Sequence, residues 1–336
     1  TATVSFEMGL APFVGHGAGA LPAYTSAYFA LVMLLALFPG KLMDNIGKII
    51  TPVLILALAV LGGAAFLLPA GSMLASSGDY QQAALAEGFT QGYQTMDALG
   101  ALVFGIVIVN AIKDTGVTDA RLQTRYAIIA GMIAALGLCL VYISLMHLGA
   151  HSGSMVPDAS SGVQILTAYV QHTFGTAGMV LLAAVIVLAC LTTGVGLVSA
   201  CATYFSGLVP GSSYRGMVVA LSLVSLLFSN QGLEKLISVA VPVLVAIYPM
   251  AIALVCLSLM SGVWKSAPRV FVPVMLVALV FGLLNALQAI GMSGWTPQWL
   301  EQLPGTAMGL GWLLPVAATL MACALMDRLQ PVRARA

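Results

Sequence analysis

This sequence contains unusually few charged residues. Only 7 % of its 336 residues are charged, with 12 Lys or Arg and 11 Asp or Glu, whereas a soluble domain carries about 25 %. So few charges cannot cover the surface of a soluble fold. The net charge of +1 also excludes a protein that binds nucleic acid through a basic face. With 60 % hydrophobic residues and a mean hydropathy of +1.04, the chain is predicted to be an integral membrane protein.

Motifs for nucleotide, metal or nucleophilic chemistry are missing as well. The sequence contains no P-loop, no HExxH motif, no nucleophile elbow and no dinucleotide fingerprint in a suitable context. We therefore expect no cofactor, no coupling to ATP and no enzymatic reaction. The histidines His16, His147, His151 and His172 lie at predicted outer loops or span ends. Their positions show no metal-binding spacing, and we interpret them as interface residues.

Five cysteines lie inside apolar runs, without CxxC spacing. They are Cys139, Cys190, Cys201, Cys256 and Cys323. This pattern predicts small core residues rather than disulfides or metal ligands.

Long apolar runs are abundant. A helix needs about 20 mostly apolar residues to cross the hydrocarbon core, and we identify nine complete candidate spans. They lie at residues 24–40, 50–69, 92–112, 122–147, 177–208, 214–229, 236–260, 269–291 and 309–327. Residues 1–10 look like the end of a tenth. Because the runs are continuous, the predicted fold class is an all-α integral membrane protein and not a β-barrel.

The basic residues predict the direction of the spans. When alternate loops are assigned to the cytoplasm, eleven of the twelve Lys and Arg lie inside, and Lys235 is the exception. The positive-inside rule then places the end of segment 1–10 outside and the C-terminus in the cytoplasm. A chain that starts in the cytoplasm needs an odd number of spans to arrive outside. Since the sequence also lacks an initiator Met, we expect that its N-terminus is cut.

The segment Gly88–Gly105 is unusual for a membrane helix, because its apolar part contains several glycines, Thr95 and the ionisable Asp97. Glycine weakens a helix by about 1 kcal/mol relative to alanine, and a charge at the bilayer centre costs at least roughly 2.5 kcal/mol. One interpretation is a broken helix whose free backbone groups bind a small polar substrate or ion, with Thr95 or Asp97 capping its second half. The other is an Asp97 near the outer surface and glycines that serve helix packing.

A second unusual segment, Ala189–Gly196, lies within the predicted span 177–208 and contains two adjacent threonines. The hydroxyls of Thr192 and Thr193 can donate to the carbonyl one turn earlier, which is a common structural role. Alternatively, they can join the Ala189 carbonyl in a cage of hard oxygen atoms around a small cation. The residues leave both interpretations open.

Two features lie at the predicted outer side. Glu7 is an acidic residue in the apolar N-terminal segment, and it is a functional candidate unless it lies at the surface. Residues 161–174 carry apolar side chains at helical spacing. This spacing predicts a short outer helix, which is either a lid on the bundle or a surface amphipathic helix.

Several stretches, in order along the chain, carry a family resemblance. They are Thr1–Glu7, Pro39–Leu42, Gly92–Gly100, Phe104–Ala111, Ala168–Gly175, Val241–Pro249 and Trp312–Pro315. In these stretches the chain resembles the bacterial branched-chain amino acid:cation symporter family. The resemblance implies import of leucine, isoleucine and valine across the bacterial cytoplasmic (inner) membrane, by symport with Na⁺ or H⁺.

The same resemblance implies the inverted repeat of the leucine-transporter fold, in the amino acid–polyamine–organocation (APC) superfamily, with typically twelve spans. Residues 1–10 would then end the third span, and the first two spans would be absent. In proteins of this fold the first span is the other broken helix. We therefore expect that the chain starting at Thr1 does not transport on its own.

The resemblance also assigns candidate binding residues. The implied substrate-binding residues, all in or beside the span 92–112, are Tyr93, Thr95, Met96, Asp97, Gly100, Phe104 and Gly105. Met96 and Phe104 would line an apolar pocket for the substrate side chain. Asp97 would attract the substrate ammonium or a cation, or only cap a half-helix. The implied sodium site consists of the Ala189 carbonyl and the hydroxyls of Thr192 and Thr193.

Two rival functions are compatible with the same residues. A passive channel or facilitator for a small polar solute would use the broken helix as a selectivity element, and it would not accumulate the solute. A carrier that lacks its first spans would not transport at all. Asp97 and Glu7 are isolated acidic residues, so they do not form the acid/base constellation of a membrane enzyme.

Overall fold

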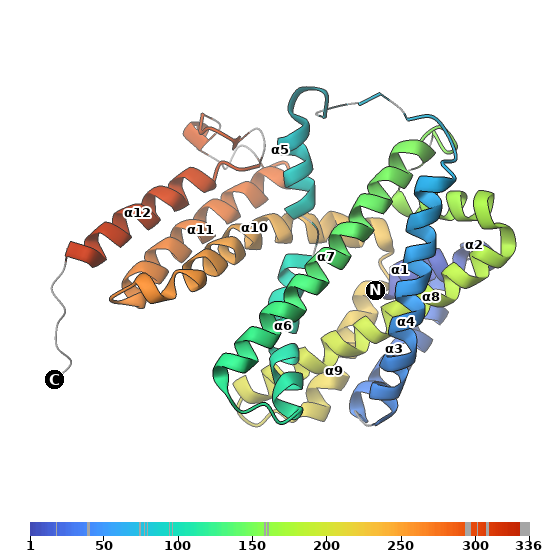
Figure 1. The fold of residues 1–336 in the computed structure, drawn as a ribbon, viewed down its shortest axis with the longest axis horizontal. Coiled ribbons are helices and arrows are strands. Elements are labelled where there is room, and N and C mark those ends of the chain that lie inside the picture. Colours follow the sequence, from blue (N-terminus) through green and yellow to red (C-terminus); the bar gives the residue numbers. More distant parts are fainter. Residues whose placement is uncertain are drawn as a thin grey trace. The chain divides into compact units, whose positions relative to one another are not determined.

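The computed structural model describes residues 1–329 except 18, 39–40, 74, 77, 79, 94, 96, 158, 160, 293–296, 301 and 307–308. Within these residues the chain forms α-helices and short 3-10 helices, and no strand (Figure 1). The all-α fold class is therefore confirmed for this part of the chain. The helices belong to two compact units. The first consists of Thr1–Ala75 and Val103–Leu236, and the second of Ser76–Leu102 and the residues from Ile237 onward.

The first unit is built around one long helix, α8. Its helices are α1 (Ala2–Gly9), α2 (Ala11–Val14), α3 (Ala20–Leu37), α4 (Lys41–Leu67), most of α6 (Asp97–Asp114), α7 (Ala120–Ser152), α8 (Gly162–Leu208) and α9 (Tyr214–Ser229). Helix α8 packs against α1, α3, α4, α7 and α9. Val32, Val195 and Val218, from three of these helices, are at most 1 % exposed in the core. This core fixes the segment that contains Thr192 and Thr193.

Two separate helical stretches make up α8. At Gly175 the backbone adopts φ 63° and ψ −158°, a conformation that is essentially restricted to glycine. The chain therefore turns between the helix 162–174 and the longer part that follows. A separate helix at 161–174 was expected from the spacing of its apolar residues. Tyr169 and Val170 of this short helix are buried against Ala65 of α4 and Leu148 of α7.

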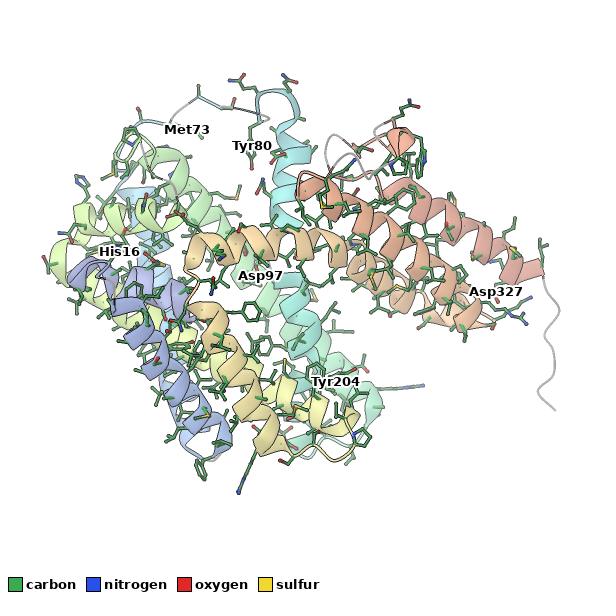
Figure 2. The ribbon with its side chains drawn as sticks, turned by 180° about the vertical axis from the view of Figure 1, so that it is seen from behind. His16, Met73, Tyr80, Asp97, Tyr204 and Asp327 are labelled. Atoms are coloured by element: carbon green, nitrogen blue, oxygen red, sulfur yellow. The ribbon has the colours of Figure 1, made fainter. Side chains whose placement is uncertain are left out.

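The second unit contains α5, α11 and α12 and nearly all of α10. Its elements are α5 (Tyr80–Tyr93), α10 (Leu233–Leu259), the 3-10 helix η1 (Ser261–Val263), α11 (Ala267–Ala289), the 3-10 helix η3 (Gln298–Leu300) and α12 (Leu313–Leu329). Leu257, Val270 and Trp312 are at most 2 % exposed in its core. Asp327 lies near the end of α12 (Figure 2), and its carboxylate accepts hydrogen bonds from the backbone N–H groups of Lys265 and Ser266, just before α11.

Six of the described helices are long and apolar enough to cross a membrane. They are α3, α4, α7, α8, α10 and α11. Helix α7 indicates that these helices are not surrounded by water. None of its most apolar stretch is buried, and side chains such as Met132 and Ile133 are more than two-thirds exposed. Such a surface is stable in contact with lipid or with further apolar helices. The assignment of nine spans remains a prediction.

Candidate functional site

The predicted span 92–112 is interrupted in the structure. Helix α5 ends at Tyr93 and α6 begins at Asp97. The hydroxyl of Thr95 donates a hydrogen bond of 2.7 Å to the Gly92 carbonyl. Thr95 therefore adds a side-chain hydrogen bond at the end of α5. Asp97 is the first residue of α6, and its side chain is exposed (Figure 2). The positive end of the helix dipole stabilises a carboxylate at this position.

A tyrosine from α10 holds the backbone at this interruption. Tyr248 is 1 % exposed, and its hydroxyl donates a hydrogen bond to the Thr95 carbonyl. Both residues belong to the second unit. The bond ties the backbone at the interruption to the packed helix α10. Sequence reasoning missed Tyr248, because one tyrosine in a long apolar run carries no spacing signal.

The other residues expected to bind substrate are distributed over both units. Gly100 belongs to the second unit, and Phe104 and Gly105 belong to the first. A Cβ atom on Gly100 or Gly105 would meet no described atom of its own unit within 4 Å. Neither glycine is therefore in close contact with another helix among the described residues of its own unit. Met96 and the side chain of Tyr93 lie outside the described residues.

Phe104 of α6 contacts α8, the helix that contains Thr192 and Thr193. Its ring atom Cε1 lies 3.3 Å from the position that a Cβ on Gly196 of α8 would occupy. Gly196 follows Thr192 by four residues, so the two lie one turn apart on the same face of α8. The structure therefore places one expected substrate residue next to the turn of α8 that contains the expected cation ligands.

The two threonines direct their hydroxyls at one carbonyl oxygen. Thr192 and Thr193 each donate a hydrogen bond of 2.9 Å to the Ala189 carbonyl. These are the bonds of the structural interpretation. The same geometry gathers two hydroxyl oxygens and one carbonyl oxygen, which is a hard donor set of the kind that a small cation prefers. To bind a cation, the hydroxyl protons would turn away from the carbonyl.

A second tyrosine that the sequence analysis missed lies against this part of α8. Tyr28 of α3 is 5 % exposed, and its hydroxyl donates a hydrogen bond to the Cys190 carbonyl. The same oxygen would lie 2.9 Å from a Cβ on Gly194. The turn between Ala189 and Gly194 is therefore held from outside the helix by a phenol group, which restricts how its carbonyl oxygens move.

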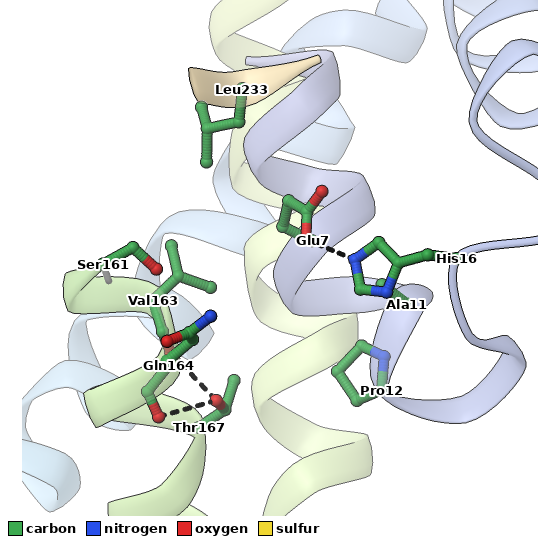
Figure 3. Close-up of a pocket in the computed structure, with 9 residues that line it drawn as sticks. All are labelled: Glu7, Ala11, Pro12, His16, Ser161, Val163, Gln164, Thr167 and Leu233. Carbon is green, nitrogen blue, oxygen red and sulfur yellow. Dashed lines mark hydrogen bonds and ion pairs between the residues drawn. The ribbon is translucent and has the colours of Figure 1, made fainter. Parts of the chain in front are cut away.

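A cavity of about 260 Å³ lies at one end of the first unit (Figure 3). Its lining comes from α1, from α2 and the loop that follows it, from the short helix 162–174 with the residue before it, and from the start of α10. The lining residues are Glu7, Ala11, Pro12, His16, Ser161, Val163, Gln164, Thr167 and Leu233. Within it, Oε2 of Glu7 lies 2.9 Å from Nε2 of His16. The cavity therefore brings together the two outer features of the sequence, Glu7 and the helix beginning at residue 162.

Known proteins match this chain over nearly its whole length. A sequence model of the family described as "Branched-chain amino acid transport protein" matches residues 1–330. The branched-chain amino acid transport system 2 carrier protein of Pseudomonas aeruginosa is 59 % identical over 329 residues, which cover 98 % of this chain and 75 % of that protein. The branched-chain amino acid permease BrnQ of Escherichia coli (strain K12) is 49 % identical over 328 residues, covering 98 % of this chain and 74 % of the permease. No solved structure matches the chain.

Proposed function

Because the chain belongs to the family of branched-chain amino acid transport proteins, we propose that it imports leucine, isoleucine and valine across the bacterial cytoplasmic membrane. The observation that carries the proposal is the 59 % identity to a branched-chain amino acid carrier over 98 % of the chain. The family resemblance seen in the sequence is thereby confirmed. The relatives are named as transport proteins, which supports a transporter rather than an enzyme.

The proposed mechanism is cation symport by alternating access. A substrate bound at the break of a discontinuous helix is exposed to one side of the membrane and then to the other. The interruption between Tyr93 and Asp97, with its backbone held by Tyr248, supports this assignment. The aliphatic side chain of the substrate would contact Phe104, and the free backbone groups would hold its polar end. Neither ATP nor nucleic acid takes part.

The proposed coupling ion is Na⁺ at the carbonyl of Ala189 and the hydroxyls of Thr192 and Thr193, with H⁺ as the alternative. The donor set supports Na⁺, because both hydroxyl oxygens lie 2.9 Å from the same carbonyl oxygen in the structure. The ion binds when these oxygens replace its hydration shell. The ring of Phe104, one turn further along α8 at Gly196, would then couple ion binding to the position of the substrate.

The proposed arrangement in the membrane follows the distribution of basic residues. It is the leucine-transporter fold, with the C-terminus in the cytoplasm and the cavity at Glu7 on the outer side. The short helix 162–174 lines that cavity through Val163, Gln164 and Thr167. We assign this helix the role of a lid whose movement opens and closes the outer entrance.

Uptake of labelled leucine tests the proposal. The full-length protein is reconstituted into liposomes, and Na⁺ and H⁺ gradients are imposed separately. We expect accumulation above the external concentration with one inward gradient, and competition by isoleucine and valine but not by lysine. Equilibration without accumulation, whatever the gradient, would identify a passive facilitator instead. The absence of any uptake would identify a non-transporting carrier.

A further inference from the structure

Two histidines lie one turn apart at the end of α7. His147 and His151 are separated by four residues, and residues at that spacing are neighbours on one face of a helix. The centres of their rings are 4.2 Å apart, and the ring planes are inclined at 38°. Both side chains are half-buried at the helix end. Their sequence positions were interpreted as showing no metal-binding spacing, whereas helix α7 places the two rings side by side.

A backbone hydrogen bond sets the tautomer of one ring. Nδ1 of His151 lies 2.9 Å from the His147 carbonyl oxygen. Because a carbonyl only accepts hydrogen bonds, Nδ1 carries the proton, and in the neutral ring Nε2 keeps its lone pair. A histidine that ligates a metal typically donates its other ring N–H to such an acceptor. His151 is therefore held in the tautomer that a metal ligand needs.

The ring of His147 is held by a phenylalanine from another helix. Phe66 of α4 stacks on it, with ring centres 4.3 Å apart and planes inclined at 22°. Helices α4 and α7 pack against each other in the first unit. A ligand whose rotamer is already held by packing loses less freedom when it binds a metal. Both imidazoles are thus oriented before any ion arrives.

We propose that His147 and His151 form a binding site for a divalent transition-metal ion of the Zn²⁺ type, with water completing its coordination. Imidazole nitrogen suits Zn²⁺, Cu²⁺ and Ni²⁺, and two histidines four residues apart on a helix bind zinc from one face. No group of three or more His, Cys, Asp or Glu that could hold a metal occurs among the described residues. The pair is therefore an open, two-ligand site that exchanges its ion with the medium.

Calorimetric titration of the purified protein with Zn²⁺ tests the site. We expect that His147→Ala and His151→Ala each weaken binding by at least about tenfold, because each removes one of two protein ligands. The matched control is His172→Ala, which removes an exposed histidine elsewhere in the first unit and leaves binding unchanged. Equal affinity in all three variants would overturn the proposal.

A variant in which one histidine is moved tests whether binding depends on the spacing of the two histidines and not only on their number. In the double variant Gly149→His, His151→Ala the two histidines are two residues apart and lie on different faces of α7, so binding should be as weak as in His151→Ala. Affinity equal to that of the unmodified protein would contradict the geometry.

Electron paramagnetic resonance with Cu²⁺ as the probe tests the site in the unmodified protein. Coupling to two nitrogen ligands is expected, and coupling to one or none would overturn the site.

Discussion

The ring of Phe104 rests against Gly196, with Cε1 3.3 Å from the place of the missing Cβ. The contact joins α6, which follows the helix interruption, to α8, which carries Thr192 and Thr193. Any side chain at position 196 must move the ring, since a contact this short leaves no space for further atoms. The position of the ring therefore depends on the absence of a side chain on the neighbouring helix.

Substitution of Gly196 should impair leucine uptake through Phe104. Gly196→Val adds bulk where the ring lies, and overpacking of this kind costs about 1–3 kcal/mol. We expect the KM for leucine to rise about tenfold, the equivalent of roughly 1.4 kcal/mol.

The control for this substitution lies on the same helix. Gly207 of α8 has no described atom within 4 Å of its Cβ position, so Gly207→Val should leave the KM unchanged. If Gly196→Val and Gly207→Val behave alike in uptake assays, the contact with Phe104 has no role in transport.

The hydroxyl of Tyr248 should matter for transport more than for folding. Tyr248→Phe removes the hydrogen bond to the Thr95 carbonyl and leaves that group unpaired, at a cost of about 1–3 kcal/mol. Since the carbonyl lies at the helix interruption, we expect leucine uptake to fall severalfold. Tyr214→Phe is the matched control, because the hydroxyl of that tyrosine donates to the Ala36 carbonyl of α3, away from the interruption. Equal loss of uptake in both variants would indicate a general packing effect.

The two threonines of α8 should determine the sodium dependence of uptake. We expect Thr192→Ala with Thr193→Ala to raise the Na⁺ concentration for half-maximal leucine uptake at least about tenfold, because two of three oxygen ligands are removed. Thr203→Ala is the control, since the Thr203 hydroxyl makes the same kind of bond to the Ser199 carbonyl on the same helix. Unchanged Na⁺ dependence in the double variant would leave the threonines with the structural role alone.

Asp327 should stabilise the second unit without taking part in transport. Its carboxylate is 4 % exposed and accepts hydrogen bonds of 2.7 Å from the N–H of Lys265 and 3.1 Å from that of Ser266. Asp327→Ala leaves both donors without this acceptor, so we expect a loss of about 1–3 kcal/mol in unfolding free energy. Thermal unfolding in detergent measures it. Arg328→Ala, at the exposed neighbouring position, should leave the melting temperature unchanged.

Some features of the site were predictable because their causes are local. Glycines together with Asp97 destabilise a continuous membrane helix, so an interruption near residue 95 follows from the nearby sequence. Adjacent hydroxyls at Thr192 and Thr193 reach only the carbonyls of their own helix, which is why Ala189 was named as their partner. The roles of Tyr28, Tyr248 and the His147–His151 pair were not predicted. The two tyrosines donate to carbonyls more than 150 residues away, and the histidines were interpreted as showing no metal-binding spacing.

By itself, the sequence determined that this protein is a helical membrane protein, because charge content and the length of apolar runs depend only on composition and order. Long similar stretches also determined its family. Only the tertiary structure decided that Phe104 lies on Gly196, that Tyr248 holds the Thr95 carbonyl, and that Glu7 shares a cavity with the helix beginning at residue 162. Such contacts join segments far apart in the chain. They depend on how whole helices pack, and local residue patterns do not encode that packing.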